Sequence, residues 1–366
     1  MNKYIQDILL VSIITLVSAC TPTTSEQKEE KSTSASQAPT KVIFMIGDGM
    51  GLAQISAALI ANSTLNLERT TVTGLVTTYS TDNLITDSAA GGTAMATGTK
   101  TYNGAISVDT TKAPLKTIVE YAEENGMNTG IIATSSITHA TPASFYAHNK
   151  TRKDDEGIAS DLPYSGVDIF MGGGRKFFAH RADSTNLLQE LKSNGYTIVE
   201  SMQQAKDAEA EKLGYFIDEE QPVSYMSGRG NFLPEATAVS LDFLDKKDEG
   251  FFMMIEGSQI DWGGHANDMK YIITEMLDFD RAIGKVLDYA EKDGNTLVVI
   301  TADHETGGLA LTGGDLDSQY VEGDFGTGGH TAIMVPVFAY GPGAEHFSGI
   351  QDNTDLNKKI MQLLDL

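Results

Sequence analysis

Aspartate and histidine are the residue types in this chain that could carry chemistry, and they gather where apolar runs give way to polar, glycine-rich stretches. These stretches cover residues 47–51, 256–265 and 302–308, and they follow the apolar runs 42–46, 251–255 and 296–301. Two of the seven histidines lie in them beside an aspartate, and a third, His330, precedes the run 335–339. Carboxylate oxygen and neutral imidazole nitrogen are ligands that zinc takes, so the set predicts a metal site.

A single residue of this kind is more often a helix cap or a hydrogen-bonded loop residue than a metal ligand. Asp261 and His265, however, stand four residues apart, a ligand spacing that is common in metal sites. Four stretches that each carry Asp, Glu or His favour the metal site over separate structural roles.

A second candidate lies in the stretch 86–98, where Thr86, Asp87 and Ser88 are followed by small residues. This composition is typical of a helix start that can approach a ligand closely. The free N–H groups and the dipole of such a helix would favour an anion beside Ser88. On its own the pattern also fits an ordinary capped helix.

The elements between these stretches must bring them together. Strand length and composition are found in the runs 42–46, 130–133, 167–171, 251–255, 296–301 and 335–339. Most are continuous rather than alternating, which suits strands covered on both faces. Amphipathic stretches at 115–125, 186–194 and 268–292 predict helices between them. The alternation predicts a three-layer α/β/α sandwich around a large, mostly parallel sheet, whose ligands collect at the carboxyl ends of the strands. Residues 313–329 are rich in Gly and Asp and predict a surface insertion.

Charge limits the choice of partners. The 366 residues carry a formal net charge of −24, which argues against nucleic acid because polyphosphate binding needs an excess of Lys and Arg. A small anionic substrate stays possible, because bound divalent cations reverse the local field.

The first forty residues predict export. Residues 1–20 combine an early lysine with an apolar run too short to span a bilayer, which is typical of a signal peptide. The sequence before Cys20 resembles a bacterial lipobox, so Cys20 is expected to be the lipidated first residue of a lipoprotein in the periplasm or at the cell surface. An ordinary signal peptide is the alternative. Residues 21–40 are expected to form a flexible tether, and 41–366 the catalytic domain.

The ordered set of motifs resembles the alkaline phosphatases. The motifs are Gly47-Asp48-Gly49, Thr86-Asp87-Ser88-Ala89, His139-Ala140-Thr141-Pro142, Glu256-Gly257-Ser258-Gln259-Ile260-Asp261, Thr301-Ala302-Asp303-His304 and Gly329-His330. The order and spacing match from about residue 41 to the end, and the pattern is most similar to compact bacterial members from cold environments. The resemblance implies hydrolysis of small phosphomonoesters, the alkaline-phosphatase-like fold and a homodimer in which residues 313–329 form a reduced crown.

The resemblance also implies a role for each residue of the motifs. The first zinc would be held by Asp261, His265 and His330, and the second by Asp48, Asp303 and His304 together with the nucleophile Ser88. Magnesium would be held by Glu256, Thr141 and Asp48, and Arg152 would grip the phosphate. Two zinc ions serve both ends of an in-line displacement, and Ser88 would become a phosphoseryl intermediate.

Two positions depart from the archetypal bacterial pattern. His139 stands where that enzyme has an acidic residue beside magnesium, and Trp262 stands where it has a lysine near the phosphate. A neutral histidine should hold magnesium less tightly and leave room for zinc to compete. Loss of the lysine should weaken phosphate binding.

Other enzymes of the same superfamily are the first alternative. Sulfatases carry a Cys/Ser-x-Pro-x-Arg pattern that the residues around Ser88 do not match, and diesterases commonly use Thr and lack the third-metal ligands Glu256 and Thr141. Phosphoglycerate mutases carry a large inserted domain, for which this chain is too short. A non-catalytic surface protein that binds metal or phosphate is the second alternative, but it would tolerate loss of the nucleophile, which is present.

Overall fold

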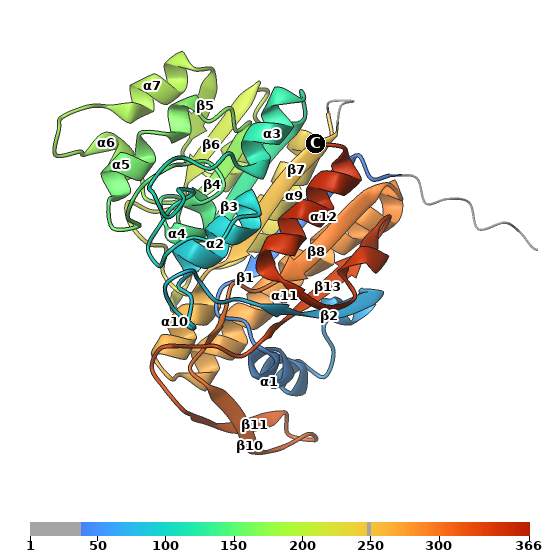
Figure 1. Ribbon diagram of the computed structural model, residues 1–366. Helices are drawn as coiled ribbons and strands as arrows, with labels where there is room; N and C mark the ends of the chain where they lie inside the picture. Colours follow the sequence, from blue (N-terminus) through green and yellow to red (C-terminus); the bar gives the residue numbers. More distant parts are fainter. Residues whose placement is uncertain (1–37, 247–249) are drawn as a thin grey trace, which may run out of the picture. The chain divides into compact units, whose positions relative to one another are not determined.

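A ten-stranded sheet forms the centre of the computed structural model, which describes residues 38–246 and 250–366 (Figure 1). The strand order is β14-β2-β13-β8-β1-β7-β3-β4-β6-β5. The strands are β1 (Lys41–Gly47), β2 (Val72–Thr77), β3 (Asn128–Ser136), β4 (Ile169–Gly173), β5 (Tyr196–Val199), β6 (Lys212–Phe216), β7 (Phe251–Gly257), β8 (Thr296–Thr301), β13 (Val335–Tyr340) and β14 (Gly349–Asp352). Only β13 runs antiparallel to its neighbours β8 and β2, and the other pairs are parallel. The predicted mostly parallel sheet is therefore confirmed.

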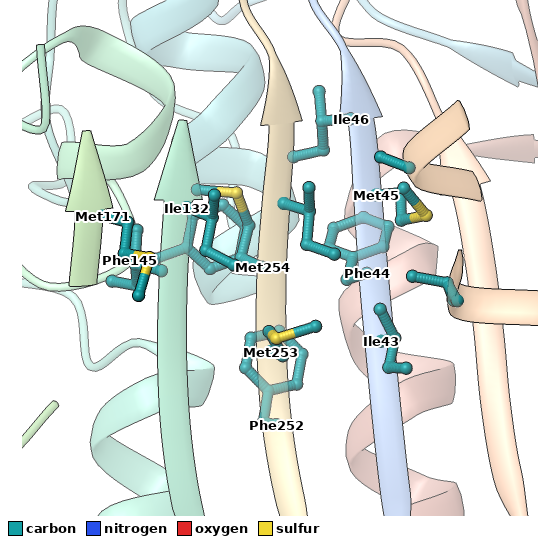
Figure 2. Close-up of a cluster of buried hydrophobic side chains, with 14 of the residues drawn as sticks. Ile43, Phe44, Met45, Ile46, Ile132, Phe145, Met171, Phe252, Met253 and Met254 are labelled. Atoms are coloured by element: carbon teal, nitrogen blue, oxygen red, sulfur yellow. The ribbon is translucent and has the colours of Figure 1, made fainter. Parts of the chain in front are cut away.

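The central strands are buried along their whole length, which explains their continuous apolar sequences. Figure 2 shows side chains from β4, β3, β7 and β1 packed beside one another, several of them methionines. Met45, Met253 and Met254 are fully buried. Methionine is unbranched and adapts to irregular gaps, so these side chains can fill the spaces left between the buried Phe and Ile side chains of the core.

Helices cover both faces of the sheet (Figure 1). On one face α1 (Leu52–Asn62) and α9 (Phe232–Leu244) pack against the long α11 (Met269–Asp293). On the other, α2 (Ser88–Thr97) packs against α12 (Asn353–Leu364) and α3 (Ile118–Glu124). The remaining helices are α4 (Ala140–Ala143), α5 (Asp155–Ala159), α6 (Lys176–Ala179), α7 (Leu187–Ser193), α8 (Met202–Lys206) and α10 (Gln259–His265). This is the predicted three-layer sandwich.

Helix α11 shows how local sequence sets an element. Its first turn is capped by the Asp268 side chain, which accepts a hydrogen bond from the Tyr271 N–H over 3.0 Å. Its apolar residues form one buried stripe, and the helix ends at Gly294, whose φ of 74° lies in the left-handed region. The prediction of a helix over 268–292 is confirmed to within one residue at each end.

The segment 313–329, predicted as a surface insertion, contains most of a β-hairpin. Strands β10 (Leu309–Asp315) and β11 (Tyr320–Phe325) form an antiparallel hairpin that begins before the predicted segment, with an irregular register between Leu311 and Gly313. Beside it, β9 (Glu305–Thr306) pairs with β12 (His330–Thr331). That short ladder links the polar stretch after β8 to His330. The role of the hairpin as a crown at a dimer axis stays a prediction.

The remaining predictions concern the start of the chain. The proposed signal peptide, Cys20 and most of the tether lie outside the described residues. Among residues 38–246 and 250–366, no helix is both long and apolar enough to cross a bilayer.

Candidate metal and phosphate site

The predicted ligands meet at one edge of the sheet because their strands are in register. In β1, Ile46 pairs with Thr301 of β8 on one side and with Glu256 of β7 on the other. Asp48 and Asp303 each follow two residues later, so they leave the sheet at the same level, just beyond Glu256. His330 precedes β13 in the sequence, whereas Asp48 and Asp303 follow β1 and β8. It reaches the same edge because β13 runs antiparallel, which places the start of β13 beside the carboxyl end of β8.

Within residues 38–246 and 250–366, three groups of side chains could each hold a metal ion, with ligand atoms within 4.8 Å of one another. Cluster 1 is Asp261, His265 and His330, cluster 2 is Asp48, Asp303 and His304, and cluster 3 is Asp48, His139 and Glu256. Clusters 1 and 2 are the two sets predicted for zinc. Cluster 3 brings His139 directly beside the predicted magnesium ligands Asp48 and Glu256, and Thr141 is also buried.

The orientation of two histidines in cluster 1 is fixed by backbone carbonyls. His265 Nδ1 lies 2.8 Å from the Gly328 carbonyl oxygen, and His330 Nδ1 lies 2.9 Å from the Thr86 carbonyl oxygen. A carbonyl oxygen only accepts, so each Nδ1 carries a hydrogen, and in the neutral ring each Nε2 keeps its lone pair. The two Nε2 atoms face each other at 3.2 Å. Two lone pairs at this distance call for a cation between them.

Buried carboxylates without partners point the same way. Both carboxylate oxygens of Asp48, Asp303 Oδ2 and Glu256 Oε1 have no hydrogen-bond partner among the residues that the structure describes, and neither does the Thr141 hydroxyl. Uncompensated buried charges are strongly unfavourable. Clusters 1 and 2 offer oxygen and imidazole nitrogen, which fit zinc. Cluster 3 offers mostly oxygen, which fits magnesium.

Crowding of these acids shifts their pKa values. Burial, followed by the charge of Asp261, raises the pKa of Asp303 to about 6, and burial raises that of Glu256 to about 7. Burial and the charges of Asp303, Asp261 and Glu256 raise the pKa of Asp48 well above its ordinary value. The pKa of His265 is raised as well, to about 9, because its hydrogen bond with Asp261 stabilises the charged ring. A dication bound here replaces protons at several groups at once.

Ser88 is held against cluster 2 by the small residues of its helix. It is the first residue of α2, is 1% exposed, and its Oγ lies 3.3 Å from His304 Nε2. A Cβ on Gly91 would lie 3.1 Å from the Asp303 Cβ. The helix can therefore rest directly on the strand-end loop only because glycine stands at that position.

Arg152 is oriented by two neighbours. Its Nη1 lies 3.2 Å from Asp87 Oδ2, and its Nη2 lies 3.2 Å from His139 Nε2. Burial, together with the Arg152 charge, lowers the pKa of His139 to about 3, so the ring is neutral and its nitrogen can accept from the guanidinium. Trp262 packs its ring edge-on to His139, with 6.0 Å between ring centroids.

Sequence reasoning missed three contributors to this site. Asp87 belongs to a sequence motif that gives it no role of its own, but in the structure it both caps α2 and pairs with Arg152. Thr306 contacts both Asp261 and His304. Ser258 donates a hydrogen bond of 2.5 Å to Glu256 Oε2. All three lie within two residues of a predicted site residue, and that proximity was the available signal.

Comparisons with known proteins agree with this geometry. The family model for alkaline phosphatase matches residues 40–323. Alkaline phosphatase 3 of Bacillus subtilis (strain 168) is 34% identical, with 100% of this chain and 98% of that protein covered. The alkaline phosphatase of Escherichia coli (strain K12) is 30% identical over 91% of this chain and 88% of that protein.

Solved structures extend the likeness to three dimensions. The alkaline phosphatase from the Antarctic bacterium TAB5 superposes with a TM-score of 0.86 at 45% identity, covering 90% of this chain and 99% of that one. The cold-active alkaline phosphatase from Shewanella sp. gives a TM-score of 0.82 at 33% identity, covering 88% and 99%. With relatives aligned over nearly its whole length and a family model matching most of it, the chain belongs to the alkaline phosphatase family and is a phosphomonoester hydrolase.

Proposed function

We propose that this enzyme cleaves phosphate monoesters in two displacements at Ser88, in a site that takes two zinc ions and one magnesium ion. The observation that carries the proposal is the contact of Ser88 Oγ with His304 of cluster 2, which shares Asp48 with cluster 3 and is joined to cluster 1 through Thr306. Zinc would be held by clusters 1 and 2. Magnesium would be held by Asp48, Glu256 and Thr141, beside His139.

Each residue has a task in the reaction. Ser88 Oγ attacks phosphorus, the alcohol leaves, and a phosphoseryl ester forms; water then attacks that ester from the vacated side and releases phosphate. When bound, the metal ions would lower the pKa of the serine hydroxyl and of water and stabilise charge on the leaving oxygen. The free N–H groups at the start of α2 favour the dianion beside Ser88.

Arg152 supplies the remaining recognition. Its guanidinium is planar and can donate two parallel hydrogen bonds to phosphate oxygens. Asp87 and His139 hold it near the start of α2, so it loses little conformational entropy when the substrate binds. The site thus reads the phosphoryl group, and we expect broad tolerance of the alcohol.

Hydrolysis of p-nitrophenyl phosphate tests the proposal. Wild-type protein should be active at alkaline pH, lose activity in chelator, and regain it when zinc and magnesium are returned. Ser88→Ala should lose activity by at least about 10³-fold, as enzymes do when their nucleophile is removed. The matched control is Ser240→Ala, because Ser240 is equally buried but its hydroxyl has no partner among the described residues. Turnover of a diester or sulfate ester, with p-nitrophenyl phosphate left intact, would contradict the proposal.

His139 is proposed to set the preference of the third site. A histidine-to-aspartate variant of the TAB5 enzyme has magnesium bound in its M3 site. In this chain His139 is neutral, so it adds no charge to the carboxylates of Asp48 and Glu256. His139→Asp should tighten magnesium binding, which equilibrium dialysis can measure. Unchanged magnesium affinity would contradict this role.

We further propose that the enzyme is an exported homodimeric lipoprotein, anchored at the membrane only through Cys20. Leu52, Ile333 and Met334 are exposed by 52%, 61% and 38%, and they line an apolar pocket of about 260 Å³ beside α1. Exposed apolar surface of this kind supports association with a second copy. Light scattering should give twice the chain mass for wild-type protein and the mass of one chain for Ile333→Asp. A monomeric wild type would contradict the dimer.

The lipid anchor is tested separately, because Cys20→Ser should abolish lipid labelling.

A further inference from the structure

Thr306 lies between clusters 1 and 2 and contacts a side chain of each. It is fully buried in β9, and its Oγ1 lies 2.5 Å from Asp261 Oδ1 and 3.2 Å from His304 Nδ1. Asp261 belongs to cluster 1 and His304 to cluster 2. One hydroxyl therefore joins the two predicted zinc sites.

The direction of this hydrogen-bond chain follows from the chemistry of its members. A threonine hydroxyl has one hydrogen to donate and lone pairs that accept. The ionised carboxylate of Asp261 only accepts, so the Thr306 O–H donates to Asp261. The remaining contact then requires the Nδ1–H of His304 to donate to Thr306. As a consequence the His304 lone pair stands on Nε2, the nitrogen that faces Ser88 Oγ at 3.3 Å and Asp303 Oδ2 at 3.2 Å.

We propose that Thr306 is a positioning residue that fixes the tautomer of His304 and the orientation of Asp261, and so couples the two zinc sites. This role rests on the proposed function. His265 and His330 have their tautomers fixed by backbone carbonyls, which no substitution removes. Of these three histidines, His304 alone depends on a side chain.

The backbone holds Thr306 firmly enough for this role. Its N–H donates to the Gly49 carbonyl over 3.2 Å, and its own carbonyl accepts from Gln54 Nε2 over 2.8 Å. A Cβ added to Gly49 would lie 2.8 Å from the Thr306 hydroxyl, and one on Gly264 would lie 2.8 Å from its methyl carbon. Glycines therefore pack closely against the side chain on two sides, where any larger residue would displace it.

Zinc affinity of three variants tests the role. Thr306→Val keeps the shape of the side chain and removes the hydroxyl, whereas Thr306→Ser keeps the hydroxyl. Thr237→Val is the matched control, because Thr237 is also buried and its hydroxyl has no partner among the described residues. In competition with a colorimetric chelator, Thr306→Val should bind zinc about 10- to 100-fold more weakly, the usual effect of losing an outer-shell partner. Thr306→Ser and Thr237→Val should stay close to wild type.

The tautomer is measured separately by nitrogen NMR of histidine-labelled, metal-free full-length protein, with His304 assigned from its absence in His304→Gln. Wild type should show a protonated Nδ1 and a bare Nε2 at His304, and Thr306→Val should lose this preference. A protonated Nε2 in wild type would overturn the proposal even if Thr306→Val failed to fold.

The titration also separates this role from the proposed function. Wild-type zinc uptake combined with an unchanged affinity in Thr306→Val would overturn only the role of Thr306, as would an equal loss in Thr306→Ser. Wild-type protein that takes up no zinc would overturn the proposed function, and the coupling with it.

Discussion

At the scale of single residues, Asp87, the neighbour of the proposed nucleophile Ser88, does more than cap a helix. Asp87 Oδ1 accepts from the N–H groups of Ala90 and Gly104 over 3.0 and 3.1 Å, while Oδ2 pairs with Arg152. The same carboxylate therefore sets both the start of α2 and the position of Arg152, the proposed phosphate-binding residue. Movement of either the start of α2 or Arg152 would therefore change the surroundings of Ser88.

Asp87→Asn separates these two tasks. The amide oxygen can still accept from the Ala90 N–H, but the charge that holds Arg152 is gone. Because both partners are about a fifth exposed, the ion pair is expected to contribute ~0.2–1 kcal/mol, which corresponds to phosphate inhibition weakened by up to about fivefold. Asp268→Asn is the control, since Asp268 caps α11 in the same way. Equal phosphate inhibition in wild type and Asp87→Asn would contradict the role of the pair.

Residue types near the apolar runs predict only a metal site, and the division of its residues into two sets follows from the resemblance to the alkaline phosphatases. The structure brings the same two sets together as clusters 1 and 2. The contacts of His139 are harder to predict. The resemblance places it only near magnesium, and its hydrogen bond with Arg152 depends on how two segments thirteen residues apart fold back on each other. Sequence spacing does not encode such a contact.

At the scale of elements, α2 contains glycines where helices ordinarily avoid them. Replacing a glycine by alanine in a helix interior usually stabilises the fold by ~0.5–1 kcal/mol. Gly91→Ala should do the reverse, because its Cβ would lie 3.1 Å from the Asp303 Cβ and 3.4 Å from the Asp303 carbonyl oxygen. We expect a lower melting temperature and weaker zinc binding. A higher melting temperature with full activity would show that α2 can move away from the loop without harm.

The strands that the sequence did not predict lie toward the two ends of the sheet. They are β2 and β14 at one end and β5 and β6 at the other. Strands there are covered less completely, and their sequences are short or alternating; β14, for example, is half exposed and polar. Continuous apolar runs therefore marked the central strands well and the outer strands poorly.

Tertiary pairing explains the other differences. Strand β13 was predicted in place, but nothing in its composition shows that it runs antiparallel to β8. The hairpin β10–β11 is rich in Gly and Asp and largely exposed. Only a few of its apolar residues, Leu309, Leu311, Val321 and Phe325, are buried or partly buried, so the sequence gives a weak strand signal.

At the scale of the whole molecule, a chain of net charge −24 concentrates acids in its interior as well. Without metal ions the crowded carboxylates of clusters 2 and 3 are destabilising, and ions that bind only the folded state stabilise it by mass action. Chelation should therefore lower the melting temperature, not only the activity. The lower melting temperature of the metal-free protein should also depend on pH.

The sign of that dependence follows from groups whose pKa is higher in the folded, metal-free state than in the unfolded chain. Burial raises the pKa of Glu256 to about 7, and the Asp261 hydrogen bond raises that of His265 to about 9. The folded state then binds more protons than the unfolded state, so stability falls as pH rises through these values. His139 and His304, whose pKa values burial lowers, act in the opposite sense only below their ordinary value of 6.5. Between pH 6.5 and about 9, metal-free protein should lose stability steadily.

Thermal unfolding across this range, with and without zinc and magnesium, measures the difference. Metal-loaded protein should hold a nearly constant melting temperature, because its ligands have already released their protons and no longer titrate there. Metal-free protein should melt at progressively lower temperature as pH rises. The same slope in both samples would place its origin outside clusters 1 to 3, and a metal-free protein that gains stability above pH 7 would contradict the electrostatic account of this site.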